Sequence, residues 1–324
     1  MRINTAQCAA FYKHFVLEGD DVAPCCRWSK NFQKFDGDFS QVLHSKKFVE
    51  LRKKVESGYK LKECSKCYYE EKLGRSLSLR QKLNMEWGVD TVQVESLELN
   101  LNNVCNLACI MCNSHFSSRI WKEENPTLPA NQGIWRLKDI PNIPDTVKRI
   151  RFMGGEPLMT DVHRQVLCSI KDPSKVEIQY ITNGMFMLTP EDVVLLNKCA
   201  KVAIYVSIDA YGKLNEEIRI GSEWNQIEKF VDDILNNTNY VLGIETVLHK
   251  KSWKGLVDLL LWIEEKRKIR PIIWSVHPLI VPQRLSIKNL NLNESKELME
   301  IVTKYYNIPD SKQIHKMLNN DNII

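Results

Sequence analysis

The pattern of hydrophobic and polar positions changes near residue 91. Before that point regular alternation is weak, and the clearest element is a helix expected over "SKKFVELRKKVES". Beyond it, "ESLELNLNN" alternates Leu97, Leu99 and Leu101 with polar residues, which is typical of a β-strand. Five more short apolar or β-branched runs follow, "VKRIRFM", "VEIQYIT", "VAIYVSI", "YVLGIETVL" and "PIIWSVH". These runs predict six strands after residue 91.

Helical patterns lie between these strands. The clearest is "EWNQIEKFVDDILNN", whose apolar residues form one stripe at helical spacing: Trp224, Ile227, Phe230, Val231, Ile234 and Leu235. Strands that alternate with helices predict an α/β fold with a parallel sheet, here a partial (β/α)6 TIM-like barrel over residues 91–282. We expect a small cysteine-rich module over residues 1–90 and a short helical extension over 283–324. In such barrels the functional site lies at the C-terminal ends of the strands.

Composition and charge narrow the class of protein. No apolar run approaches the length of a membrane span, and the N-terminus lacks the apolar core of a signal peptide, so we expect a cytoplasmic protein without a membrane partner. Ten cysteines in such a chain favour metal binding or thiol chemistry over a disulfide framework. The net charge of +5 comes from residues 1–90, where 17 Lys and Arg face 12 Asp and Glu. The basic stretch "LRKKVESGYKLK" carries no recognition motif, so a nucleic-acid partner is not expected.

The segment "CNLACIMC" follows the first of the six strands and places Cys105, Cys109 and Cys112 in a C-x3-C-x2-C spacing. Three thiolates on one loop suit either zinc or an iron–sulfur cluster. A structural zinc site needs a fourth ligand, for which His115 is a candidate. A [4Fe–4S] cluster held by three thiolates instead leaves one iron open for chemistry.

This spacing after a first strand resembles the motif of radical S-adenosylmethionine (SAM) enzymes, in which the amino and carboxylate groups of SAM chelate the open iron. The segments "FMGGEP", "ITNG", "VSIDA" and "EEIRIGSEW" extend the resemblance in order over about residues 95–280. The resemblance implies that "GGEP" binds the amino group of SAM. It implies the following set of cofactor contacts, the last three of them to the carboxylate or ribose: Gly154, Gly155, Glu156, Asn183, Ser207, Asp209 and Arg219.

The N-terminal region carries five further cysteines, at Cys8, Cys25, Cys26, Cys64 and Cys67. Four thiolates from these five would form a closed site, and a structural zinc is one interpretation. An early Cys, then "PCC", then a distal C-x2-C resembles the auxiliary-cluster modules called SPASM and twitch domains, although such modules usually follow the core. The resemblance implies one auxiliary [4Fe–4S] cluster, whose negative charge the excess of Lys and Arg would stabilise.

The implied activity is that of a radical SAM enzyme. A reductant such as flavodoxin or ferredoxin would reduce the cluster, SAM would be cleaved to a 5′-deoxyadenosyl radical, and the radical would take hydrogen from a substrate. Relatives with auxiliary modules often modify peptides or proteins, so a peptide or protein is the first expectation. A small metabolite, such as a sugar or nucleotide derivative, is the second. A non-catalytic iron–sulfur or zinc protein that transfers electrons or binds a partner is the alternative from another class.

Cys168 and Cys199 fall on predicted outer helices and are expected to be buried structural thiols.

Overall fold

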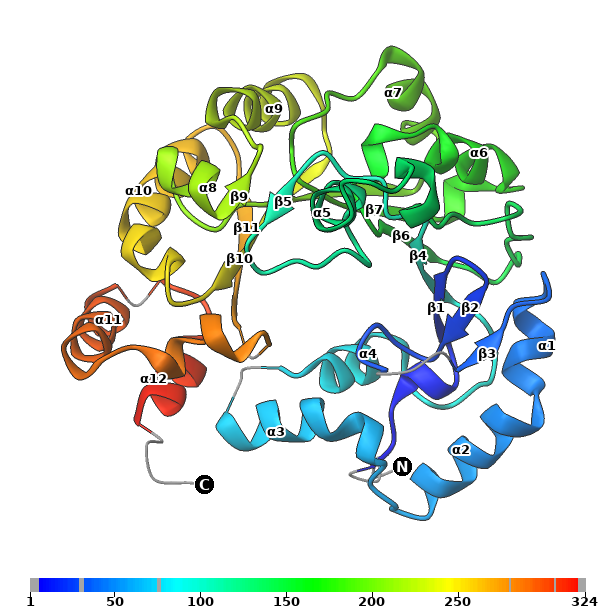
Figure 1. Cartoon of the computed structure of the whole chain (residues 1–324). Helices are drawn as coiled ribbons and strands as arrows, with labels where there is room; N and C mark the ends of the chain where they lie inside the picture. Colours follow the sequence, from blue (N-terminus) through cyan, green and yellow to red (C-terminus); the bar gives the residue numbers. More distant parts are fainter. Residues whose placement is uncertain (1–5, 29–31, 75–76, 280, 306, 320–324) are drawn as a thin grey trace.

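Six parallel strands form the centre of the computed structural model, which describes residues 6–28, 32–74, 77–279, 281–305 and 307–319 (Figure 1). In the order of the sheet they are β11 (Ile272–Pro278), β10 (Val241–Leu248), β8 (Lys201–Ser207), β7 (Glu177–Thr182), β6 (Arg149–Met153) and β4 (Ser96–Asn100). All five neighbouring pairs are parallel. The six strands predicted from the sequence are thus confirmed, and they form a curved, open barrel. The outermost ends of the predicted N-terminal and C-terminal regions lie outside the described residues.

Helices surround the outer face of this sheet (Figure 1). They are α6 (Val162–Ser169), α7 (Pro190–Leu196), α8 (Lys213–Ile218), α9 (Trp224–Asn237) and α10 (Leu256–Arg267). The six residues of the predicted α9 stripe are all buried. Helix α7 starts with a capping box, in which the Thr189 hydroxyl accepts from the Asp192 backbone N–H and the Asp192 carboxylate accepts from the Thr189 N–H. The partial (β/α)6 barrel is therefore confirmed.

The N-terminal region continues the core sheet instead of forming a sheet of its own. Strand β1 (His14–Glu18) runs parallel to β4, with His14 opposite Ser96. Strands β2 (Asp21–Ala23) and β3 (Gln33–Lys34) follow as antiparallel neighbours and complete a nine-stranded sheet of the described residues. The pairing of β1 with β4 is not predictable from local sequence patterns, because the two short strands are far apart in the chain.

The two terminal regions meet on the open side of the barrel (Figure 1). The N-terminal region contributes α1 (Phe39–His44), α2 (Lys46–Glu56), α3 (Ser65–Leu73) and α4 (Leu79–Trp87), and the predicted C-terminal extension contributes α11 (Leu292–Lys304) and α12 (Ser311–Asn319). Helix α12 packs against α3, and Lys288 Nζ donates to the Tyr69 hydroxyl at 2.8 Å. Residues of α3 and α4 line one cavity together with residues of the core strands, so these two helices lie opposite the inner face of the sheet.

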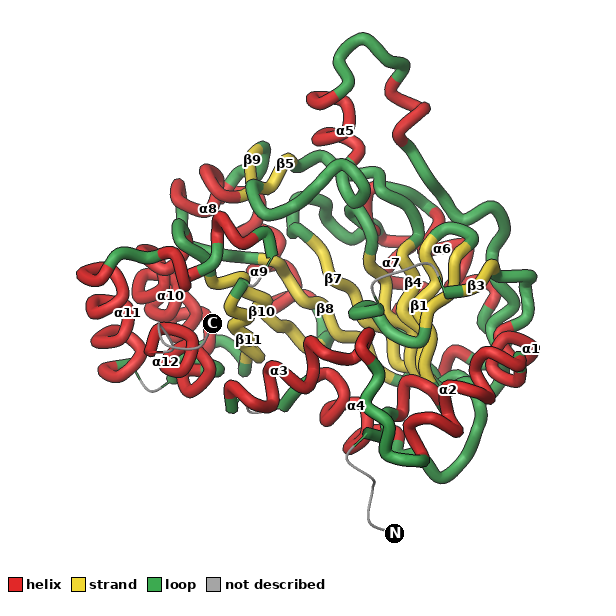
Figure 2. Tube along the Cα trace, turned by 60° about the horizontal axis from the view of Figure 1, so that its bottom comes forward, coloured by secondary structure: helices red, strands yellow, loops and turns green. Residues whose placement is uncertain are grey.

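Two smaller elements complete the top of the barrel. A two-stranded sheet pairs β5 (Ala108–Cys109) with β9 (Arg219–Ile220). Helix α5 (Ser118–Glu124) and the loop after it project away from the body (Figure 2). In the described part of the chain, every helix is too short or too polar to cross a lipid bilayer.

Candidate active site

The loop that carries Cys105, Cys109 and Cys112 follows β4 and is fixed by main-chain contacts. Strand β5 pairs with β9, so Cys109 lies opposite Arg219. The Ile110 N–H donates to the Ile218 carbonyl at 3.0 Å, and the Cys112 N–H donates to the Cys109 carbonyl at 2.9 Å. The fold therefore holds the loop at the C-terminal ends of the strands, as predicted.

The three thiols of this loop are suited to a cationic partner. The pKa of Cys105 is raised to about 12 and that of Cys109 to about 11, mainly by burial and in smaller part by the charges of neighbouring cysteines. Bound iron would displace these protons. Among the described residues, no group of three or more His, Cys, Asp or Glu side chains is arranged to hold a single metal ion.

His115 does not join the thiols as a free fourth ligand. Its Nε2 lies 2.6 Å from Glu18 Oε1, and its ring stacks at a tilt on Trp135 with a centroid distance of 5.5 Å. The imidazole is therefore held by the β1 carboxylate and by an aromatic neighbour. This arrangement weakens the zinc interpretation of the loop.

The two glycines after β6 allow close approach to the cysteine loop. The Gly155 N–H donates to the Asn102 carbonyl at 2.7 Å, and the next N–H, of Glu156, donates to the Val104 carbonyl at 2.8 Å. A Cβ at Gly155 would lie 2.3 Å from Val104 O, and one at Gly154 would lie 2.5 Å from Asn102 O. Only glycine fits both positions, so "GGEP" is joined to the segment that precedes Cys105.

Glu156 is held inside the fold by groups of the chain itself. Its side chain is buried, and its carboxylate accepts from Leu158 N at 3.0 Å, Thr182 Oγ1 at 2.8 Å and Asn183 N at 2.7 Å. Burial raises its pKa to about 7. The resemblance implied a contact with the amino group of SAM, whereas these contacts use the carboxylate to join the end of β6 to the end of β7. The predicted contact of "GGEP" with the amino group of SAM stays a prediction.

Asp209 and Arg219 form a buried ion pair. Arg219 Nε lies 2.8 Å from Asp209 Oδ2, and Arg219 Nη2 donates to Oδ1 at 3.2 Å. Asp209 Oδ1 also accepts from Val247 N at 2.8 Å. Asp209 is fully buried, while Arg219 reaches the cavity described next. The carboxylate therefore orients the guanidinium from behind.

One cavity of about 720 Å³ brings most of the predicted site residues together. Parts of β1 and the segment after β2 complete its wall. Of the predicted residues, the following line it: Cys25, Cys26, Cys105, Cys109, Cys112, Gly154, Gly155, Asn183, Ser207 and Arg219. Asn183 is positioned there by its Nδ2, which donates to Asn106 Oδ1 at 2.9 Å. The residues predicted to hold the cluster and most of those predicted to contact SAM thus line one cavity.

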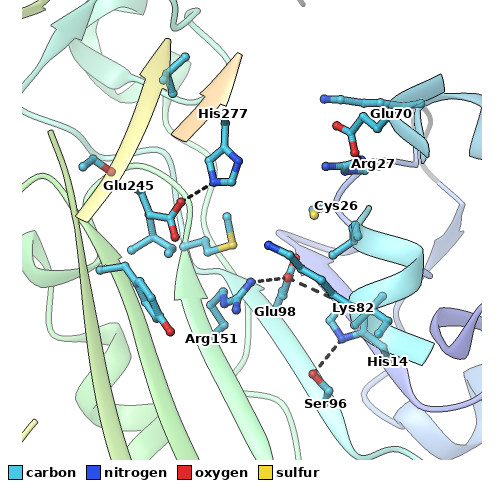
Figure 3. A pocket seen from close by; sticks show the side chains of 18 of the residues that line it. His14, Cys26, Arg27, Glu70, Lys82, Ser96, Glu98, Arg151, Glu245 and His277 are labelled. Atoms are coloured by element: carbon cyan, nitrogen blue, oxygen red, sulfur yellow. Dashed lines mark hydrogen bonds and ion pairs between the residues drawn. The ribbon is translucent and has the colours of Figure 1, made fainter. Parts of the chain in front are cut away.

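A second cavity of about 520 Å³ shares part of this wall and extends into the barrel (Figure 3). The two cavities have five lining residues in common: Cys26, Met153, Ile181, Ser207 and Arg219. Glu245 on β10 and His277 on β11 line the second cavity, and His277 Nε2 lies 2.5 Å from Glu245 Oε2. Side chains of the N-terminal region face them from the opposite wall (Figure 3).

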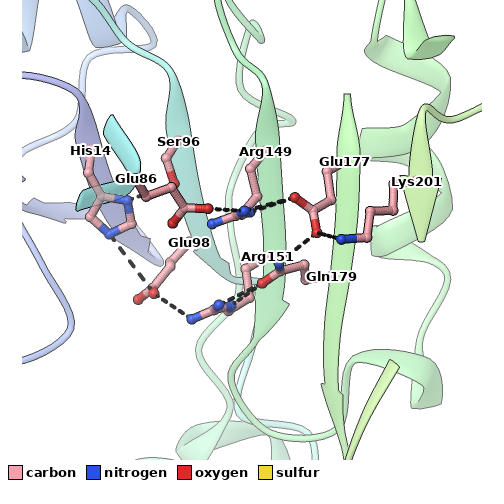
Figure 4. Close-up of polar contacts among 9 residues, drawn as sticks. All are labelled: His14, Glu86, Ser96, Glu98, Arg149, Arg151, Glu177, Gln179 and Lys201. Atoms are coloured by element: carbon pink, nitrogen blue, oxygen red, sulfur yellow. Dashed lines mark hydrogen bonds and ion pairs between the residues drawn. The ribbon is translucent and has the colours of Figure 1, made fainter. Parts of the chain in front are cut away.

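The inner face of the sheet presents polar side chains to the second cavity (Figure 4). Arg151 Nη1 donates to Glu98 Oε1 at 3.2 Å and Nη2 donates to Gln179 Oε1 at 2.6 Å. His14 Nδ1 lies 2.9 Å from Ser96 Oγ. A second row alongside links Glu86, Arg149, Glu177 and Lys201. The polar residues Ser96, Glu98 and Asn100 alternate along β4 with the apolar residues Leu97 and Leu99, so the same period of two places them on the opposite face of the strand.

Four of the five N-terminal thiols line one small cavity of about 20 Å³, namely those of Cys8, Cys25, Cys64 and Cys67. Burial raises the pKa of Cys8 and of Cys64 to about 12. Arg27 Nη1 donates to Cys67 Sγ at 3.6 Å and also pairs with the Glu70 carboxylate. Arg80 lines the same cavity. Four thiols and two nearby cations, Arg27 and Arg80, are thus gathered around one small cavity.

Cys26 is separated from that group. Its thiol is exposed to the two larger cavities, and it is not among the residues that line the small one. The sequence left open which of the two adjacent cysteines joins the others, and the structure places Cys25 with them.

The remaining cysteines lie away from these cavities. Cys168 on α6 is exposed and Cys199 is half-buried. The prediction of a buried structural thiol is therefore wrong for Cys168, because its position on α6 faces solvent instead of the sheet. Neither residue lines the cavities that contain the other eight cysteines.

Comparison with known proteins adds a family match. A family model of the radical SAM superfamily matches residues 99–263, about half of the chain. The chain is 29% identical over 109 residues to a probable GTP 3′,8-cyclase of Methanococcus vannielii, which covers 34% of this chain and 32% of that protein. It is 25% identical over 154 residues to the corresponding protein of Methanocaldococcus jannaschii, 47% of each. The matched segments thus span between a third and a half of these curated relatives. The crystal structure of Streptococcus suis SuiB aligns with a TM-score of 0.41 at 18% identity, over 66% of this chain and 48% of SuiB.

Proposed function

Since the chain belongs to the radical SAM superfamily, we propose that it cleaves SAM reductively at a [4Fe–4S] cluster held by Cys105, Cys109 and Cys112. The observation that carries this proposal is the shared cavity, in which the three thiols face Gly155 and Arg219. When bound, the cluster and SAM supply an electron and a 5′-deoxyadenosyl radical that takes hydrogen from the substrate. A one-electron reductant such as flavodoxin or ferredoxin is the expected partner.

The residues of the chain bind and orient the cofactor in this proposal. The three thiolates bind three irons and leave the fourth for the amino and carboxylate groups of SAM. Arg219, held by Asp209, pairs with the carboxylate of SAM. Asn183 and Ser207 offer amide and hydroxyl groups to its polar atoms. The main chain at Gly154 and Gly155 supplies the wall, because side chains there would collide with the cysteine loop.

The four-thiol group of Cys8, Cys25, Cys64 and Cys67 is proposed to hold one auxiliary [4Fe–4S] cluster, as in the SPASM and twitch modules that the sequence resembles. Arg27 and Arg80 support this assignment, because the cluster with four thiolates is negatively charged. The cluster would exchange electrons with the substrate site. A structural zinc is the alternative for the same ligands.

The proposed substrate is a peptide or protein whose reacting residue enters the second cavity. Its support is the proposed auxiliary module, since relatives with such modules often act on peptides. The partial similarity to probable GTP 3′,8-cyclases favours a small molecule as the second candidate. A cavity of about 520 Å³ is large enough for either a residue or a nucleotide-sized group.

Release of 5′-deoxyadenosine tests the reaction without the natural substrate. We expect the anaerobically reconstituted wild type, reduced with dithionite, to form 5′-deoxyadenosine from SAM at a slow, uncoupled rate. Cys109→Ala should abolish release, because it removes one of three cluster ligands. Cys168→Ala, which alters an exposed thiol on α6, is the matched control and should behave as the wild type. A fully loaded, reduced wild type that neither binds SAM nor forms 5′-deoxyadenosine would favour the electron-transfer or binding alternative.

Iron and zinc content test the auxiliary site. The wild type should bind about eight irons per chain, and the Cys64→Ala/Cys67→Ala variant about four, because each cluster uses its own thiolates. The variant should keep uncoupled SAM cleavage at the core cluster. One zinc and about four irons in the wild type would assign the four-thiol group to a structural zinc instead.

A further inference from the structure

Cys26 occupies the boundary between the proposed cofactor cavity and the second cavity. It lines both of them, together with Ser207 and Arg219 at the ends of the core strands. Its neighbour Cys25 belongs to the four-thiol group and also borders the cofactor cavity, but it does not line the second cavity. Figure 3 shows the Cys26 sulfur directed into the open space, across from Glu245 and His277. Cys26 thus lies outside the four-thiol group, and it faces the cavity in which the substrate is proposed to react.

Two buried polar atoms beside Cys26 indicate that this space binds a ligand. Glu98 and His14 are only 3% and 1% exposed, and both line the second cavity. Within the described residues, Glu98 Oε2 and His14 Nε2 have no hydrogen-bond partner, and His14 Nε2 is 4.0 Å from Glu98 Oε1. Buried polar atoms are normally satisfied, because leaving them unpaired costs about 1–3 kcal/mol each. A substrate with polar groups near its reacting carbon would satisfy both.

We propose that Cys26 donates a hydrogen atom to the carbon radical formed on the substrate in this cavity. The inference rests on the proposed function, which supplies that radical. In the step, the S–H bond of Cys26 breaks, a C–H bond forms on the substrate, and a thiyl radical remains on Cys26. One electron and one proton then restore the thiol. A one-electron reductant of the flavodoxin or ferredoxin class supplies the electron, and solvent supplies the proton.

This role specifies the class of reaction. The 5′-deoxyadenosyl radical removes one hydrogen atom from the substrate, and Cys26 returns one from a different direction. The substrate therefore leaves at its original oxidation level. Inversion or rearrangement at a carbon centre fits this balance, whereas a net oxidation of the substrate does not require a hydrogen donor.

Deuterium transfer from solvent tests the inference without the natural substrate. The thiol hydrogen exchanges with D2O, and during uncoupled turnover the 5′-deoxyadenosyl radical is itself the radical in the cavity. The holoprotein is incubated in D2O with dithionite and SAM, and the deuterium fraction of the 5′-deoxyadenosine formed is measured by mass spectrometry. We expect deuterium in the 5′-methyl group for the wild type and for the control Cys168→Ser. With Cys26→Ser and Cys26→Ala, the fraction should fall to background.

The outcomes separate this inference from the proposed function. No 5′-deoxyadenosine from loaded wild type refutes the proposed function itself. Product without deuterium in the wild type, or with equal deuterium in the wild type and the Cys26 variants, overturns the role of Cys26 alone. Iron content of the Cys26 variants is the second measurement. A loss of auxiliary iron in Cys26→Ser would make Cys26 a cluster ligand and would also overturn the inference.

Discussion

Replacement of Asp209 by Asn tests how the fold holds the cationic side of the cofactor cavity. The change keeps the shape of the side chain and removes its charge. The structure places Asp209 Oδ2 2.8 Å from Arg219 Nε, and Oδ1 accepts from Arg219 Nη2 at 3.2 Å and from Val247 N at 2.8 Å. Asp209 is 0% and Arg219 9% exposed, so the variant leaves a buried guanidinium without its counter-charge.

The magnitude follows from this burial. Removing one partner of a buried ion pair costs about 3–5 kcal/mol of stability. The amide oxygen of Asn can still accept from Val247 N, so we expect the lower end, about 3 kcal/mol. Arg219 would also lose its orientation toward SAM, and loss of one charge-assisted hydrogen bond, worth about 1.5–3 kcal/mol, weakens SAM binding about ten- to a hundred-fold.

Two assays measure these effects. The free energy of unfolding is obtained from urea denaturation of the iron-free protein, and SAM affinity from titration of the reconstituted protein. Glu217→Gln is the control, because Glu217 pairs with Lys251 at 3.4 Å where both side chains are about half exposed, and such pairs contribute at most about 1 kcal/mol. If Asp209→Asn matches this control in both assays, the buried pair neither stabilises the fold nor positions Arg219 for the cofactor.

Two further predictions concern the close approach of Gly155 to the segment that precedes Cys105 and the pH dependence of stability. Gly155→Ala should lower the iron retained by the core cluster, because its methyl group would lie 2.3 Å from Val104 O, and wild-type iron content in this variant would contradict that account. Burial by itself raises the pKa of Glu95. Hydrogen bonds from Lys13 and Lys148 outweigh this effect and lower the pKa to about 2. Since the pKa of an unfolded Glu is about 4.3, this stabilisation is complete above that pH and is lost as the pH falls toward 2. Glu95→Gln should therefore be less stable by on the order of 3 kcal/mol at neutral pH and show a flatter acid unfolding curve, whereas parallel curves for the two proteins would exclude this contribution.

The core of the fold could be predicted from the sequence because its information is local. The alternation of Leu97 and Leu99 with polar residues and the helical stripe of α9 each lie within one short window, and periodicity in such a window sets which face is buried. The cysteine spacing and "GGEP" are equally local, and both were placed correctly at strand ends. Their meeting in one cavity follows from the parallel order of the strands.

Long-range contacts decided what the pattern left open. The pairing of β1 with β4 joins residues 82 apart, His14 and Ser96, and it brings the N-terminal region into the core sheet. No local window contains that register. The same holds for Glu156, whose carboxylate meets a hydroxyl and a main-chain N–H at the end of the next strand.

The two adjacent cysteines show the division most clearly. The sequence determined that Cys25 and Cys26 belong to a cysteine-rich module but could not assign their roles, since neighbouring residues differ only in the side of the chain on which they project. The tertiary structure placed Cys25 with the other three thiols and at the border of the cavity of about 720 Å³, whereas Cys26 lines both large cavities and not the small one. The thiols are chemically identical, and only what packs on each side of the backbone distinguishes them.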